Sequence, residues 1–429
     1  MILEEVIEVE RARVKALVDD NIIPKSDGEK ILSCLEELKK EPRKLLEYGE
    51  AEDVFEAIEL YLQDRIGSVA SWFSLGRSRN DHIAATLRLK TKKYIARIMI
   101  LLIKLRRTLI EKAKIYASTL FPAYTHTREA QPITFGHYLL SIDEELEDHL
   151  TLLEKTFEIV DVMPLGAGAV GGTTVNLDRD KIARELGFAR HSRNTLYMVS
   201  SRGFLILPLG IVTSLLAFLS RITQDLIILS MSRYGIIKIP NKHTATSSIM
   251  PHKVNPVTLE ILRARVGESL GLFTSILDIY RATPSGYNLD FQEINRISWR
   301  IFDNTVEGLT ILHDLFSNIE IDEKRSEEIS RDPELLTADL AEILSIEKRI
   351  PHREAHRIIA SKIREKGSKC LLEEYPQLKD SMSFLEKKRF RGSPNPEEVK
   401  KFADEKEARL REYEERLSEL LKLAGTDKG

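Results

Sequence analysis

The segment from Thr246 to Pro256 (TSSIMPHKVNP) places two adjacent hydroxyls, a lysine and an asparagine close together between turn-forming residues. Removing a proton next to a carboxylate requires a base at the carbon, and cations or donors where the second negative charge develops. Ser247 could be that base if an ammonium and loop amides stabilise its alkoxide in a dry site. Lys253 and Asn255 could hold the developing charge. The competing interpretation is a surface loop of assorted polar residues.

Two further segments offer groups that such a reaction needs. His126, within Tyr124-Thr125-His126-Thr127-Arg128, could protonate a departing nitrogen, although a lone histidine is usually structural. Ser78-Arg79-Asn80-Asp81 supplies a guanidinium and an amide near the positive end of a predicted helix. Alone, this second motif is an ordinary helix cap.

Two other motifs point less clearly to chemistry. Residues 166–171 (GAGAVG) match the dinucleotide-binding fingerprint, but residues 150–162 before them have a helical rather than a strand-like pattern. His352 and His356 are one helical turn apart, yet Pro351 marks a helix start and the order is not His-Glu-x-x-His. Neither a dinucleotide site nor a metal site is therefore the favoured interpretation.

The elements that must position these groups are helices. Apolar residues recur three and four positions apart over residues 87–113, 137–159 and 403–424, and alternating strand-like runs are nearly absent. Residues 83–114 contain neither glycine nor proline, and residues 257–282 contain only two glycines. The sequence therefore predicts an all-α protein built on a bundle of long helices.

Breaks in the pattern suggest three units. We expect an N-terminal helical domain over residues 1–78, a central long-helix bundle over 79–327 and a C-terminal helical domain over 328–429. Residues 397–422 alternate acids and bases above an apolar stripe, which predicts a solvated amphipathic helix.

One segment meets the lower length limit for a membrane span. Residues 203–220 carry no charge, but they contain Pro208, Gly210 and three hydroxyl side chains, and Arg202 and Arg221 flank them. We expect a wholly buried helix of the bundle and no membrane association.

Composition excludes several classes of protein. Lys and Arg total 64 against 67 Asp and Glu, for a formal net charge of -3, which does not indicate a nucleic-acid partner. Cys34 and Cys370 are too few for a disulfide framework. The acidic, amphipathic N-terminus lacks the pattern of a secretory signal, so we expect a cytoplasmic location.

Together these motifs resemble the fumarase/aspartase superfamily. Its signature, Ser-Ser-x-Met-Pro-x-Lys-x-Asn-Pro, is matched from Ser247 to Pro256. Within it the chain is most similar to the argininosuccinate lyase family. The matching segments, in family order, are residues 76–81, 125–126, 130–137, 164–169, 287–293, 337–341, 351–356 and 396–399.

The resemblance implies a reaction and a role for each site residue. The reaction is reversible anti elimination of argininosuccinate to fumarate and arginine, the last step of arginine biosynthesis, without cofactor or metal. Ser247 would be the base, Lys253 and Asn255 would bind carboxylates, and Glu260 would polarise His126. The expected substrate-binding residues are Ser78, Arg79, Asn80 and Thr125 for the succinate portion, and Arg202, Tyr287 and Gln292 for the arginine portion or its carboxylates.

The resemblance also implies a three-domain, all-helical fold whose homotetramer forms a central bundle, with active sites drawn from three subunits. The chain departs from the family pattern at His82, Arg128, Val254 and Asn295. By the same resemblance, we expect it to begin after a segment with which family members usually contact the substrate. These departures leave two alternatives open. One is a lyase acting on another succinyl adduct, such as adenylosuccinate, or on aspartate, and the other is a structural relative without activity.

Overall fold

The protein is described by a computed structural model covering residues 2–423, with the side chains of residues 2–418. Its α-helices are α1 (Leu3–Asp19), α2 (Lys25–Lys40), α3 (Val54–Ile66), α4 (Arg79–Ile115), α5 (Phe135–Val160), α6 (Arg179–Glu185), α7 (Thr195–Ser200), α8 (Gly203–Ser230), α9 (Val257–Ala282), α10 (Asp290–Asn318), α11 (Glu323–Ser330), α12 (Thr337–Lys348), α13 (His352–Lys366), α14 (Cys370–Glu374), α15 (Ser381–Lys387) and α16 (Pro396–Leu423).

Its strands are short: β1 (Leu120–Thr125), β2 (Arg128–Thr134), β3 (Val162–Met163), β4 (Arg190–His191), β5 (Ile237–Lys238), β6 (Ala245–Thr246), β7 (Val254–Asn255) and β8 (Glu320–Ile321). They form isolated pairs, β1 with β2, β5 with β8 and β6 with β7 antiparallel, and β3 with β4 parallel. The predicted all-α class is confirmed. The β1–β2 hairpin is a short addition to this helical fold.

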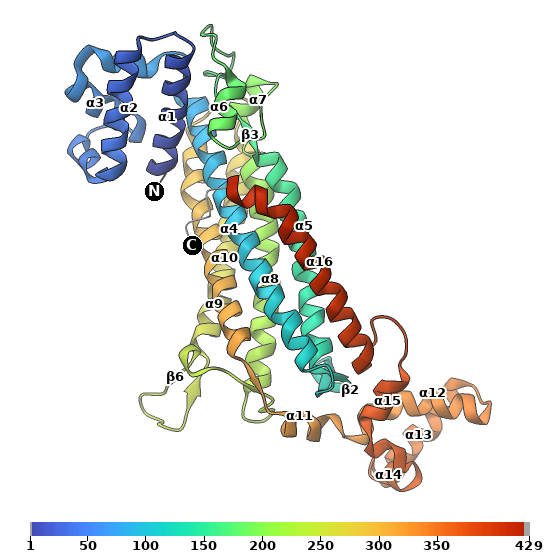
Figure 1. The fold of residues 1–429 in the computed structure, drawn as a ribbon. Coiled ribbons are helices and arrows are strands. Elements are labelled where there is room, and N and C mark those ends of the chain that lie inside the picture. Colours follow the sequence, from blue (N-terminus) through green and yellow to red (C-terminus); the bar gives the residue numbers. More distant parts are fainter. Residues whose placement is uncertain (1, 424–429) are drawn as a thin grey trace.

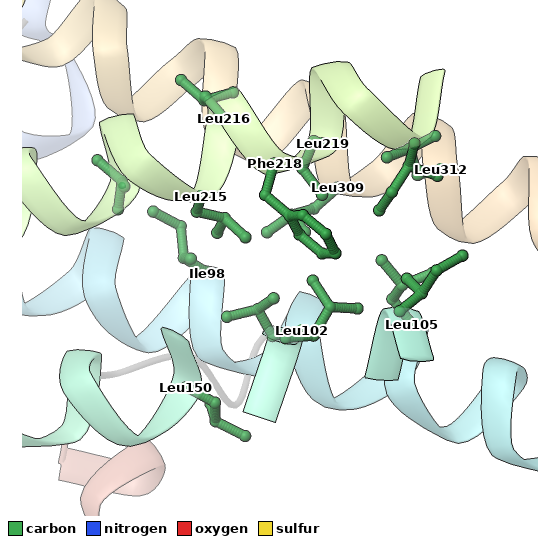
Figure 2. Packing of buried hydrophobic residues seen from close by; sticks show 14 of the residues in the cluster. Ile98, Leu102, Leu105, Leu150, Leu215, Leu216, Phe218, Leu219, Leu309 and Leu312 are labelled. Carbon is green, nitrogen blue, oxygen red and sulfur yellow. The ribbon is translucent and has the colours of Figure 1, made fainter. Parts of the chain in front are cut away.

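Long helices α4, α5, α8, α9 and α10 run side by side along the length of the molecule, and α16 lies along α4 and α5 (Figure 1). Leucines, isoleucines and phenylalanines from α4, α5, α8 and α10 point into the space between these helices (Figure 2). Burying such side chains stabilises the fold by about 1.5–3 kcal/mol each. The bundle is therefore held by a continuous apolar core along its length.

Two smaller apolar clusters lie at the ends of the bundle. One joins α1, α2 and α3 to residues 163–188, and the other lies among α12, α13, α14 and α15. Val399, Ala403, Leu410 and Leu417 on the inner face of α16 belong to the bundle core. The predicted domain limits at residues 78 and 327 stay a prediction.

Helix α8 contains the uncharged residues 203–220. By length and composition it is the one helix among residues 2–423 that could cross a membrane, and 56% of its most apolar window is buried. The expectation of a wholly buried helix is wrong on one face, because Leu207 is 50% exposed. The reason is that α4, α5, α9 and α10 cover only part of its circumference.

A buried ion network fastens α16 to the bundle. Lys406 is fully buried and pairs with Glu144 and Glu147 of α5, and its Nζ lies 3.4 Å from Asp143 Oδ2. Arg106 of α4 donates to Asp143 at 2.7 Å. Burial opposes the charge of Lys406, but hydrogen bonds to Glu144 and Glu147 outweigh it and raise the pKa of the lysine. The cation is therefore compensated by three carboxylates of α5.

Replacing Lys406 by Met should lower the free energy of unfolding by about 3–5 kcal/mol, because Asp143 and Glu147 lose a buried counter-charge. Urea denaturation followed by circular dichroism measures the change. Lys401→Met, at an exposed position of the same helix, is the matched control and should change it by less than about 0.5 kcal/mol. Equal stability of the two variants would contradict a structural role for the network.

Candidate active site

The first site segment is the N-terminus of α4, which a capping box fixes. Ser78 Oγ accepts from the amide of Asn80 at 3.3 Å, and Asp81 Oδ1 accepts from the amide of Ser78 at 2.9 Å. Arg79 and Asn80 consequently lie in the first helical turn, where the helix dipole favours a negative ligand. Ser78, Arg79 and Asn80 are all partly exposed.

A glycine-rich loop closes over this turn. Asp81 Oδ2 accepts from the amides of Gly166 and Gly168 at 3.1 and 2.9 Å, and Asn80 Nδ2 donates to the Ala169 carbonyl at 3.2 Å. Gly168 has a φ of 59°, and a Cβ there would lie 2.5 Å from the Gly172 carbonyl oxygen. Residues 166–171, which match the dinucleotide-binding pattern, therefore bind the carboxylate of Asp81 in the same chain. Burial raises the pKa of Asp81, and the amide hydrogen bonds oppose that rise.

Arg79 already has acidic partners from the start of α3. Its Nη1 lies 2.7 Å from Glu52 Oε2 and 3.4 Å from Asp53 Oδ2, and the hydrogen bond to Glu52 raises its pKa. The Arg79 side chain is 41% exposed, so screening by solvent keeps this pairing weak. A carboxylate ligand could replace Glu52 at modest cost.

A buried cluster of Glu10, Arg13, Arg77 and His82 supports the loop before α4. Glu10 is fully buried, and its Oε1 lies 2.7 Å from His82 Nδ1 and 3.2 Å from Arg77 Nη1. Its Oε2 accepts from Arg13 at 2.8 Å, and Arg13 also donates to the Leu75 carbonyl at 2.8 Å. Burial alone would raise the pKa of Glu10, but Arg13, His82 and Arg77 hold it well below its usual range.

These supporting residues were missed by sequence reasoning, which noted His82 only as a departure from the family pattern. A signal was present, since Glu10 and Arg13 interrupt the apolar face of α1 with an i, i+3 pair. Charged residues on a buried helical face need partners, and here the partners lie next to the Ser78–Asp81 segment.

Arg202, Tyr287 and Gln292 lie where α8 and α10 begin. Arg202 is fully buried, and its guanidinium lies 4.4 Å from the Phe291 ring and 5.8 Å from the Tyr287 ring. Nη1 donates to the carbonyls of Val199 and Ser201, whereas Nε and Nη2 have no hydrogen-bond partner within residues 2–418. Burial lowers the pKa of Arg202 to about 10. Gln292 is exposed beside this group.

Thr125 and His126 occupy the tip of the β1–β2 hairpin, and both side chains are exposed. His126 has a φ of 52° and Thr127 of 59°, a left-handed conformation that is costly for non-glycine residues. Such strain is typical of sites where geometry matters more than stability.

The signature segment forms a second exposed hairpin, with β6 and β7 as its strands. The Ser247 amide donates to the Lys253 carbonyl at 2.9 Å, and Ser247 Oγ accepts from the amides of Ile249 and Met250 at 3.4 and 3.2 Å. The Lys253 side chain is exposed, and Asn255 is partly exposed. The loop therefore gives the serine oxygen two amide donors.

Glu260 lies in the first turn of α9, just after this hairpin, and is exposed. Within residues 2–418, no hydrogen bond or ion pair joins Glu260 to His126. The proposed pairing of these two residues therefore stays a prediction.

The site residues fall into two groups at opposite ends of the bundle (Figure 1). Ser78, Arg79, Asn80, Arg202, Tyr287 and Gln292 lie at the starts of α4, α8 and α10. Thr125, His126, Ser247, Lys253, Asn255 and Glu260 lie where α4 has ended and α9 begins. The 37 residues of α4 separate the groups by about 55 Å. Within one chain the two groups do not meet.

Comparison with known proteins identifies the family. A family model described as "Lyase" matches residues 1–271. The argininosuccinate lyase of Pyrococcus furiosus is 42% identical, over 98% of this chain and 92% of its own length. That of Sulfolobus acidocaldarius is 39% identical, over 97% and 90%. The chain belongs to the argininosuccinate lyase family, within the fumarase/aspartase superfamily.

Solved structures agree on the fold. An EDDS lyase variant with bound fumarate superposes on this member of the argininosuccinate lyase family with a TM-score of 0.90 and 24% identity, covering 100% of this chain and 90% of that one. A 3-carboxy-cis,cis-muconate lactonizing enzyme from Pseudomonas putida gives a TM-score of 0.75 at 18% identity, with coverage of 98% and 95%. At these identities the likeness concerns the fold alone.

The contacts of Asp81 lead to a test. Asp81→Asn should lower the free energy of unfolding by about 1–3 kcal/mol, because an amide nitrogen cannot accept the amide hydrogens that the carboxylate accepts. It should also speed proteolysis within residues 166–172. Thermal melting measures the first effect, and limited digestion with elastase, which cleaves after small residues such as those of this loop, measures the second. The exposed Asp148→Asn on α5 is the control, and indistinguishable behaviour of the two variants would remove Asp81 as the anchor of the loop.

Proposed function

We propose that this chain is a carbon–nitrogen lyase that cleaves argininosuccinate to fumarate and arginine by reversible anti elimination. The observation that carries the proposal is the 42% identity to the argininosuccinate lyase of Pyrococcus furiosus over nearly the full length. The Ser247–Pro256 hairpin adds chemical support, because it presents the groups that carbanion chemistry requires.

The elimination begins at Ser247 in this proposal. Its Oγ removes the proton from the carbon next to the carboxylate, and the electron pair moves onto that carboxylate. Two amide donors at Oγ favour the anionic form of the oxygen, and Lys253 is the nearby cation of the same loop. Lys253 and Asn255 would stabilise the dianionic carboxylate, where charge develops. The electron pair then forms the double bond of fumarate and expels the guanidino nitrogen.

The leaving nitrogen must gain a proton, and His126 is the proposed acid, with Glu260 as its polarising carboxylate. Exposure at the hairpin tip leaves the imidazole free to meet a group from outside its own chain. Ser78, Arg79, Asn80 and Thr125 would hold the succinate carboxylates. Arg202, Tyr287 and Gln292 would contact the arginine portion or its carboxylates.

Assembly follows from the separation of the two groups. We propose a homotetramer in which the β1–β2 and β6–β7 hairpins of one chain meet the N-terminal end of α4 in another chain. Each site would then draw on several subunits. The outer face of α9 supports this arrangement, because Ile261, Leu270 and Leu277 are 57%, 47% and 42% exposed. Gly267 and Gly271 lie between them with open space around a Cβ, which permits close approach of another helix. A cytoplasmic location completes the proposal.

The substrate is tested by incubating the purified protein with argininosuccinate, adenylosuccinate, aspartate or malate and following fumarate by its ultraviolet absorbance. We expect release from argininosuccinate alone, and a loss of at least about 10³-fold in kcat for Ser247→Ala with unchanged thermal melting. Turnover of another member of the panel in place of argininosuccinate would refute the substrate. An active Ser247→Ala variant would refute the base.

Shared sites predict complementation between inactive chains. Asn80→Ala and Ser247→Ala alter opposite ends of the bundle, so co-expressed chains that mix at random should leave about a quarter of the sites without either change. Fumarate release by the mixed oligomer, relative to each variant alone, measures the recovery. Ser247→Ala co-expressed with Lys253→Ala is the control, since both changes fall on one hairpin. Recovery no greater than in that control would contradict sharing between the two ends.

A further inference from the structure

A basic cavity of about 550 Å³ lies near the end of the bundle at which α4 begins. It is located between the C-terminal end of α5 and the segment that contains β4 and α7. This segment is the green region around α7 in Figure 1. The residues that line the cavity are Arg88, Ile159, Val162, Arg190, His191, Ser192, Arg193, Asn194, Tyr197 and Met198. None of the site residues described above is among them.

The charged side chains that line the cavity are all basic. Three arginines and a histidine face the cavity, and no aspartate or glutamate lines it. Arg190 and Arg193 are exposed, and neither takes part in an ion pair within residues 2–418. His191 has Asp180 at 3.4 Å from its Nε2, outside the lining. The cavity therefore carries uncompensated positive charge.

Arg88 forms the buried floor of this cavity. It is 1% exposed, and its Nη1 donates to the carbonyls of Ile159 and Val160 at 3.1 and 3.2 Å. Its Nε has no hydrogen-bond partner among the residues that the structure describes, and the Phe204 ring lies 4.1 Å from the guanidinium. Burial lowers the pKa of Arg88 to about 10, and although Tyr197 opposes this, Arg202 and Arg190 add to it. A buried cation without a carboxylate partner is costly, and a bound anion would supply the missing charge.

We propose that this cavity binds a small organic anion through a phosphate or carboxylate group held by Arg190 and Arg193. Guanidinium groups bind both kinds of oxyanion in a bidentate manner. Tyr197 adds a hydroxyl that is hydrogen-bonded to Arg88, and Asn194 caps its backbone amide. Ile159, Val162 and Met198 form an apolar wall. The volume exceeds that of an inorganic ion and is within the range of small-molecule sites, so the ligand has a carbon skeleton.

The proposal goes beyond the elimination reaction and does not rest on it. Calorimetric titration of the intact wild-type oligomer tests it, with glycerol 2-phosphate and citrate as probes, sodium phosphate for comparison, and ionic strength held constant with chloride. Saturating fumarate is present to occupy sites for succinate carboxylates. We expect one site per chain for at least one organic probe, and the better probe reports whether phosphate or carboxylate is preferred.

Arg190→Gln/Arg193→Gln should weaken binding of that probe at least about tenfold, because charge-assisted hydrogen bonds are lost. Both positions are exposed, so the fold should be retained. Arg184→Gln/Arg409→Gln removes the same charge from exposed positions outside the cavity and should bind within about twofold of wild type. No binding of either organic probe in the presence of saturating fumarate, or equal weakening in both double variants, would overturn the proposal.

Discussion

The continuous packing of α4 against its neighbours is the constraint on which the rest of the structure depends. Its 37 residues pack into an apolar core shared with α5, α8 and α10, so its two ends stay far apart. The capped N-terminus carries Arg79 and Asn80, and the β1–β2 hairpin follows its C-terminus. The groups proposed for the elimination lie at both ends of this long helix. They can therefore form one site only if the ends of different chains come together.

Charged groups inside the molecule differ in how they are compensated. Lys406 and Glu10 have opposite charges around them, and their networks fasten α16 and the loop before α4. Arg88 and Arg202 are equally buried but contact carbonyls and aromatic rings instead of carboxylates. The first kind stabilises a fold. The second leaves positive charge available, which is the condition for binding an anion.

The segments of the predicted site depend on backbone geometry as much as on side chains. Ser247 Oγ receives its hydrogen bonds from main-chain amides, and the strained backbone at His126 fixes a hairpin tip. Gly166 and Gly168, which follow β3, are needed so that Asp81 can accept hydrogen bonds from their backbone amides. This explains why residues 166–171 match a phosphate-binding pattern without a preceding long strand, since both arrangements offer glycine amides to an anion.

The sequence by itself determined the helical class, the long helices of the bundle, the family and the residues that could do the chemistry, because period and motif are local properties of the chain. Only the tertiary structure decided that Glu10 and Arg13 support the Ser78–Asp81 segment, that α8 leaves Leu207 exposed, and that Arg88 lacks a counter-charge. The tertiary structure also decided that Asn80 and Ser247 lie at opposite ends of the helical bundle. The physical reason is that burial, pairing and separation in space depend on contacts between distant residues, which spacing along the chain does not encode.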